Sequence, residues 1–150
     1  MVKKGFMFLF ILLLFVGCQV TDSDSDMPSI AKQHLQQQGY TIISHEWSSE
    51  PYTLERDRLD EEYLVQVWQV QAANKEDYIG KEIYEERFIV KNHPLDDWDG
   101  KGLGKTNVYV MLVDGQVIGG TSFPITEESL VGAPFSLDGK TAEEVSFNKD

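Results

Sequence analysis

Hydrophobic and polar positions divide the chain into three stretches of different character. Residues 5–17 carry no charged side chain, whereas residues 19–26 consist mainly of serine and aspartate. From residue 28 onward, apolar residues recur with the spacings of helices and strands. Because about 120 residues commonly form one domain, residues 28–150 are predicted to fold as a single unit.

The first folded element is predicted to be a helix over residues 28–39 (PSIAKQHLQQQG). Proline is tolerated in the first turn of a helix, and Ile30, Ala31 and Leu35 share one face. Gly39 suits the left-handed position just past a helix end. These residues therefore predict a helix of about three turns with one apolar face.

Strand patterns follow the helix. Residues 40–47 and 62–72 are rich in aromatic and β-branched side chains, and residues 81–91 alternate between apolar and polar positions. Residues 62–72 (EYLVQVWQVQA) carry apolar side chains on both faces, which predicts a central strand. The polar residues 73–80 are predicted to close a hairpin between the last two strands.

The sharpest local signal lies in residues 107–123. Two apolar runs flank Asp114-Gly115, a dipeptide that favours a two-residue hairpin turn. The pair Gly119-Gly120 predicts a bulge or a close packing contact in the second strand. Short helices are expected to begin at residues 126–128 and at residues 141–144, where Thr-x-x-Glu forms a capping box.

One helix followed by an antiparallel meander predicts an α+β domain, with the N-terminal helix packed on the sheet. Over residues 28–120, this order of elements, ending in the hairpin YVMLVDGQVIGG, resembles PepSY-type domains and cystatin-like folds. The resemblance implies a regulator of an envelope protease as one alternative function. The chain is also similar to small lipoproteins of Gram-positive bacteria, a resemblance that implies no activity.

The N-terminal stretch indicates export. Lys3 and Lys4 precede the apolar residues 5–17, which are too short to span a bilayer as a helix. The sequence LFVGC ending at Cys18 resembles a bacterial lipobox, although Phe15 departs from the usual aliphatic residue. The resemblance implies cleavage after residue 17 and diacylation of Cys18. The alternative is an uncleaved membrane anchor with an incidental cysteine.

This reading places the domain on the outer face of the cell membrane. A diacylated Cys18 holds a protein stably to a membrane, and residues 18–27 are expected to form a disordered tether. Loss of Lys3 and Lys4 would move the net charge from −12 to −14, which argues against nucleic-acid binding. Because Cys18 is the only cysteine, the domain is expected to contain no disulfide.

An Asp/Gly-rich segment offers one candidate metal site. Asp97, Asp99 and Gly100 match the third, fifth and sixth positions of a calcium loop, but its first and twelfth positions lack carboxylates. A looser calcium site would use Asp96, Asp97 and Asp99, and the favoured interpretation is a turn between strands. The triplet at residues 104–106 matches the end of a phosphate-binding loop, but a strand is expected to follow it.

Catalytic constellations are not evident in the sequence. His34, His45 and His93 lack the spacing of metal ligands, and no free thiol would survive lipidation of Cys18. Adjacent acidic residues in a strand point to opposite faces. We therefore predict no catalytic residue, no cofactor and no enzymatic activity. A cell-wall hydrolase remains an alternative, since two carboxylates from different strands could lie about 5–10 Å apart.

Aromatic residues supply the last clue. Most of them, including Trp47, Tyr63 and Trp68, are expected in the core. Trp98 lies between Asp97 and Asp99 in a predicted turn, so it is either a partner contact or a side chain folded back on the sheet. The leading hypothesis is a lipid-anchored interaction module without enzymatic activity, which binds another protein or an envelope component.

Overall fold

A computed structural model describes residues 26–147, so the predicted export segment, Cys18 and most of the predicted tether lie outside the described residues. The order of helices and strands is α1 (Met27–Gln37), β1 (Thr41–Ser48), β2 (Tyr52–Thr53), α2 (Glu62–Gln69), β3 (Glu82–Lys91), β4 (Gly102–Val113), β5 (Gln116–Thr126), β6 (Phe135–Ser136) and α3 (Ala142–Phe147). Among the described residues, no helix is both long enough and apolar enough to cross a bilayer.

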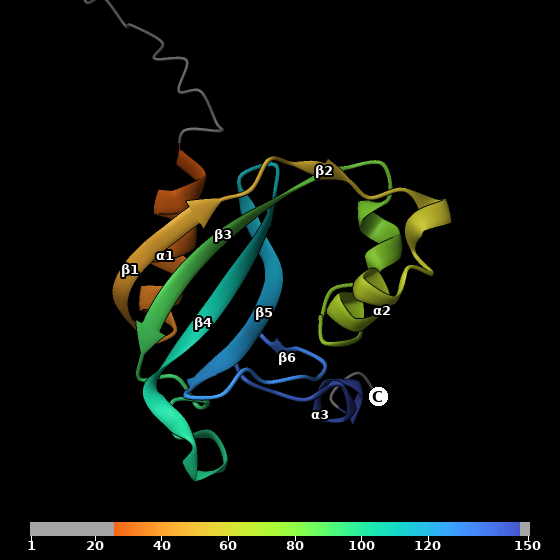
Figure 1. Cartoon of the computed structure of the whole chain (residues 1–150). Coiled ribbons are helices and arrows are strands. Elements are labelled where there is room, and N and C mark those ends of the chain that lie inside the picture. The colour runs from red at the N-terminus through yellow and green to blue at the C-terminus, as the bar shows by residue number, and fades with distance from the viewer. Residues whose placement is uncertain (1–25, 148–150) are drawn as a thin grey trace, which may run out of the picture.

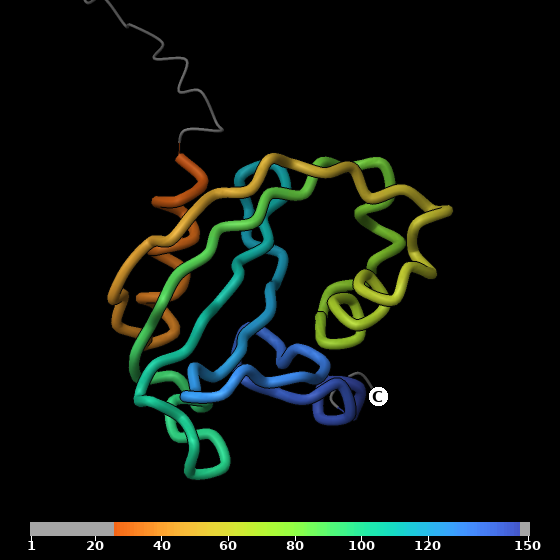
Figure 2. Tube along the Cα trace, viewed as in Figure 1, coloured from red at the N-terminus to blue at the C-terminus, as the bar shows by residue number. Residues whose placement is uncertain are grey.

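The strands form one antiparallel sheet in the order β1-β3-β4-β5-β6, and β2 continues along the β1 side of β3 (Figure 1). The predicted α+β class is therefore confirmed, and so are the strands expected at residues 40–47 and 81–91. The segment between β2 and β3 leaves the sheet, carries α2 and then returns (Figure 2). It places α2 on the sheet face opposite α1.

Helix α1 covers one face of the sheet, as predicted. Its buried residues Ala31 and Leu35 pack in a cluster with Phe88 of β3 and Val110 of β4. The helix ends where expected, because Gly39 adopts a positive φ of 90°. An apolar stripe on the helix thus meets the apolar face of the strands, and this contact forms the larger part of the core.

The prediction of a strand at residues 62–72 is wrong, because residues Glu62–Gln69 form the helix α2. Leu64, Val67 and Trp68 are buried, at the i, i+3, i+4 spacing of a helical face, and they pack near Ile83 and Met111 on the face opposite α1. The hairpin predicted through residues 73–80 is consequently wrong as well. This segment contains a 3₁₀ turn that leads back to β3.

Hydrogen bonds of the Gln71 side chain connect the α2 layer to the sheet. Its buried amide donates to the carbonyls of Val67 (2.8 Å) and Gly120 (3.0 Å) and accepts from the backbone N–H of Gly120 (2.8 Å). A Cβ at Gly119 would overlap the Gln71 side chain. The predicted close packing contact at the glycine pair is therefore confirmed, and a register shift after Met111 supplies the predicted bulge.

Local turn and cap signals were reliable with one exception. Asp114 and Gly115 link β4 to β5 with positive φ at both central positions, as a type I′ turn requires. Thr141 and Glu144 form the predicted capping box at the start of α3. The helix expected at residues 126–128 is wrong: β5 runs to Thr126 and a bend follows.

Candidate binding site on the open sheet face

The register of the sheet brings four side chains into one row across its strands. Trp47 of β1 pairs with Arg87 of β3, which pairs with Tyr109 of β4, which pairs with Thr121 of β5. Direct cross-strand partners point to the same face of a sheet. This is the face that carries α2, since Glu85 and Arg87 alternate with Glu86 and Phe88 of the α1 face.

Aromatic rings lie in this row and beside it. The Trp47 and Tyr109 ring centroids lie 6.0 Å apart, and those of Tyr109 and Phe123 lie 5.9 Å apart at an interplanar angle of 85°. Tyr63 of α2 faces them across the cleft and is 62% exposed, while Trp47 is 38% exposed. We call Trp47, Tyr63, Tyr109 and Phe123 the aromatic face. Edge-to-face contacts of this kind hold rings in fixed orientations.

A cavity of about 310 Å³ lies against the aromatic face. The sheet, α2 and the segment before β6 all contribute to its lining: Tyr63, Gln66, Val67, Tyr109, Thr121, Phe123, Gly132 and Pro134. None of these side chains is charged. The cavity therefore combines aromatic walls with the Gln66 amide and the hydroxyl groups of Tyr63, Tyr109 and Thr121, the composition expected of a small-ligand pocket.

Arg87 is held in place on this face. Its Nε and Nη2 atoms donate to Oδ1 of Asn107 at 3.3 Å and 3.0 Å, and its guanidinium lies 5.6 Å from the centre of the Tyr109 ring. The cation–π contact and the two hydrogen bonds fix a positive charge beside the aromatic rings. An arginine ordered in this way can donate further N–H groups to a ligand without first being immobilised.

Glu85 supplies the opposite charge. It is half-buried, its backbone N–H donates to Ser49 Oγ, and its carboxylate makes no hydrogen bond or ion pair within residues 26–147. Burial alone raises the pKa of the Glu85 carboxyl above its ordinary value. A half-buried carboxylate without a partner costs stability, which is a common property of ligand-binding sites.

The charge of Glu85 affects the pKa of two tyrosines. Burial, followed by the charge of Glu85, raises the pKa of Tyr63 to about 12. The same two causes, in the same order, raise the pKa of Tyr52. The Tyr52 hydroxyl is buried and has no hydrogen-bond partner among the described residues. The Glu85 carboxylate and the Tyr52 hydroxyl thus interact electrostatically, and neither uses its hydrogen-bonding capacity within the described fold.

A second polar cluster lies on the opposite face of the sheet. The buried carboxylate of Glu86 accepts hydrogen bonds from His45 Nε2 and from Ser48 Oγ, each at 2.7 Å. In a hydrolytic triad the serine donates to the histidine and the histidine donates to the carboxylate. Here both groups bond the carboxylate, so the serine is not activated. The cluster instead joins β1 to β3.

The acidic segment at residues 96–99 is organised as a turn. The Asp96 carboxylate accepts hydrogen bonds from the backbone N–H of His93 (3.2 Å) and from Thr106 Oγ1 (2.8 Å). Because Thr106 belongs to β4, the second bond connects the turn to that strand. Asp97 is exposed, and Asp99 pairs with Lys101 at 3.1 Å. Within residues 26–147 no group of three or more His, Cys, Asp or Glu is placed to hold a metal ion. A calcium site at Asp96, Asp97 and Asp99 stays a prediction.

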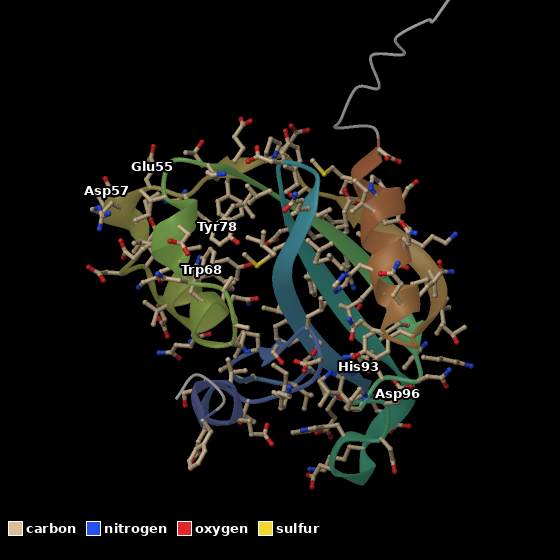
Figure 3. The ribbon with its side chains drawn as sticks, turned by 180° about the vertical axis from the view of Figure 1, so that it is seen from behind. Glu55, Asp57, Trp68, Tyr78, His93 and Asp96 are labelled. Carbon is tan, nitrogen blue, oxygen red and sulfur yellow. The ribbon has the colours of Figure 1, made fainter. Side chains whose placement is uncertain are left out.

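Trp98 and His93 have partners within the fold. Trp98 is half-buried, and its ring lies edge-on to Phe135 with 6.4 Å between centroids. It packs on its own sheet, so a partner contact at Trp98 stays a prediction. The buried His93 ring accepts from the Leu95 N–H through Nδ1 and bonds the Leu137 carbonyl through Nε2 (Figure 3). His34 lies on α1, far along the chain from both.

Sequence reasoning missed the aromatic face. Trp47, Tyr63 and Trp68 were all expected in the core, whereas the structure buries only Trp68 and leaves Trp47 and Tyr63 partly exposed. Trp68 stacks on Tyr78 with 5.9 Å between ring centroids, and both belong to the cluster that packs α2 on the sheet (Figure 3). The one available signal was the alternation within residues 81–91, which placed Glu85 and Arg87 together on the face opposite Phe88. It did not show which strands lie beside them.

Nothing in the described residues indicates an enzymatic activity. Comparison with protein-family models, with curated proteins and with solved structures finds no match for this chain.

Proposed function

We propose that this protein is a lipid-anchored extracytoplasmic binding module without enzymatic activity, and that the aromatic face is its binding surface. The observation that carries the proposal is the row of partly exposed rings beside an unpartnered carboxylate, Glu85. Exposed aromatic side chains and desolvated charges both cost stability in a protein with no ligand. Binding energy gained from a ligand is the simplest physical reason for placing them together.

The location rests on the N-terminal sequence. Lys3, Lys4 and the apolar residues 5–17 have the pattern of an export signal, and Cys18 stands where a lipobox requires it. A lipid anchor would confine the domain to the membrane surface, where even a weak binding surface meets its partner at a high effective concentration. We therefore place the protein on the outer face of the cell membrane, with an envelope component as its partner.

The anchor is tested by metabolic labelling with a clickable palmitate analogue. The wild-type chain should take up the label, remain in the membrane fraction and give a mature N-terminal peptide that begins at the acylated Cys18. The Cys18→Ala variant should lose the label. An unmodified N-terminus at residue 1 in the mature wild-type protein would show that the segment is an uncleaved anchor.

The binding surface is tested by photo-cross-linking in intact cells. A photoreactive phenylalanine analogue at position 63 lies on the aromatic face, whereas the same analogue at the exposed position 33 of α1 lies on the other side of the sheet. We expect a saturable adduct at position 63 that is absent at position 33 and weakened by Trp47→Ala. Equal adducts at both positions, or none at position 63, would refute this assignment.

A further inference from the structure

We propose that the aromatic face binds a neutral saccharide, an inference that rests on the binding function proposed above. Three rings from α2, β4 and β5 (Tyr63, Tyr109 and Phe123) line one cavity. The C–H face of a pyranose ring is apolar and packs on aromatic rings, while its rim carries hydroxyl groups that need hydrogen-bond partners. The cavity supplies both kinds of surface.

The polar groups around the cavity match a polyhydroxylated ligand. Gln66 and Thr121 lie in its lining and each can both donate and accept. Glu85 and Arg87 flank the rings on β3, two residues apart and hence about 6.6–6.8 Å apart along the strand. They form no ion pair with each other: Arg87 bonds Asn107, and Glu85 has no bonded partner in the described part of the chain. Each therefore retains capacity to bond a hydroxyl group.

Charge limits the class of saccharide. The cavity lining is uncharged, and the whole chain carries a net charge of −12. An acidic protein repels polyanions at long range, so sulfated or phosphate-rich polymers are disfavoured. The single arginine of the site is balanced by Glu85 on the same face of the same strand. A ligand without net charge fits this arrangement best.

Peptides fit the same surface less well. The aromatic face lies in the middle of the sheet, where the strand backbones are bonded to one another and are not free to pair with an added strand. An extended peptide lying there would leave its own N–H and C=O groups without partners. A cavity of about 310 Å³ is at the small end of ligand pockets, which suits one or two rings better than a docked helix.

The test is calorimetric titration of the full-length protein in a detergent that has no sugar headgroup. The probes are tetrasaccharides of β-1,4-linked N-acetylglucosamine, β-1,4-linked glucose and α-1,4-linked glucose, with a sulfated tetrasaccharide for comparison. We expect at least one neutral probe to bind with a Kd below about 1 mM, and the sulfated probe to bind more weakly.

Matched variants locate the site. Tyr63→Ala and Trp47→Ala should each weaken binding about tenfold, whereas Tyr63→Phe keeps the ring and should retain most of the affinity. Phe147→Ala removes a ring on α3 that is more exposed than either of these, and it should leave the Kd unchanged. Affinity that is unaffected by both alanine substitutions would overturn the proposed site.

The outcomes separate the ligand class from the binding function. If no neutral tetrasaccharide binds while position 63 still cross-links to a protein in cells, the saccharide proposal fails and the binding surface stands. If neither saccharide binding nor a cross-link at position 63 is found, both proposals fail. Tighter binding of the sulfated probe than of every neutral probe would overturn the inference from charge.

Discussion

Replacing Glu85 by glutamine should stabilise the protein at neutral pH. The substitution keeps the size of the side chain and removes one charge that is half-buried and unpartnered in the described structure. Burial raises the folded-state pKa of Glu85 above that of the unfolded chain. Proton binding to Glu85 therefore favours the folded state below the ordinary pKa of 4.5, and this contribution is lost as pH rises through the raised folded-state pKa.

The size of the effect follows from what is removed. No hydrogen bond or ion pair of the Glu85 carboxylate within residues 26–147 is lost, so only the cost of desolvating a charge disappears. We expect a gain of about 1 kcal/mol in the free energy of unfolding at pH 7, equivalent to about 3–5 °C in Tm for a domain of this size. At pH 4 the carboxyl group is protonated in both states, and the gain should vanish.

Thermal unfolding followed by circular dichroism at pH 4, 5, 6 and 7 measures this dependence. Glu82→Gln is the matched control, because Glu82 is exposed on the same strand and its substitution should change Tm little at any pH. If Glu85→Gln lowers Tm at pH 7, the carboxylate stabilises the fold and our interpretation of it is wrong. The same variant should bind a neutral tetrasaccharide more weakly, because it gains stability by losing a carboxylate that the proposed site uses for binding.

Three further predictions concern the scaffold. Gln71→Ala should lower the free energy of unfolding in urea by about 2–3 kcal/mol, because it leaves the Gly120 N–H and C=O without partners. Burial lowers the pKa of His93, so stability should fall as pH drops from 6.5 through the lower folded-state pKa, and His93→Gln should remove this phase from a pH series of Tm values. Gly102→Ala should cost about 2 kcal/mol or more by urea unfolding, since its Cβ would overlap the Asp96 carbonyl.

Local chemistry explains why some elements were predictable. The turn at Asp114-Gly115 and the cap at Thr141 depend on the φ preferences or side-chain hydrogen bonds of a few neighbouring residues. Gly39 ends α1 for the same kind of reason. The strand at residues 82–91 was also predictable, because each of its faces meets a different environment and its side chains alternate accordingly.

Helix α2 could not be predicted from its local sequence. Its sequence (EYLVQVWQ) combines β-branched residues with apolar positions at helical spacing, and both patterns fit so short a segment. Packing of the segment against the sheet selects the helix over the strand. Leu64, Val67 and Trp68 pack on Ile83 and Met111 of the sheet, and Gln71 bonds the backbone of Gly120 in β5. Tertiary contacts of this kind regularly override the intrinsic preference of a segment.

The sequence by itself determined the acidic charge, the α+β class and the turns that depend on neighbouring residues, while the export signal stays a prediction. The candidate site was decided only by the tertiary structure. Trp47, Arg87, Tyr109 and Thr121 are scattered over half of the chain, and they meet because the register of four strands aligns them. Register depends on the simultaneous packing of both faces of the sheet, and a shift by one residue would turn every one of these side chains to the other face.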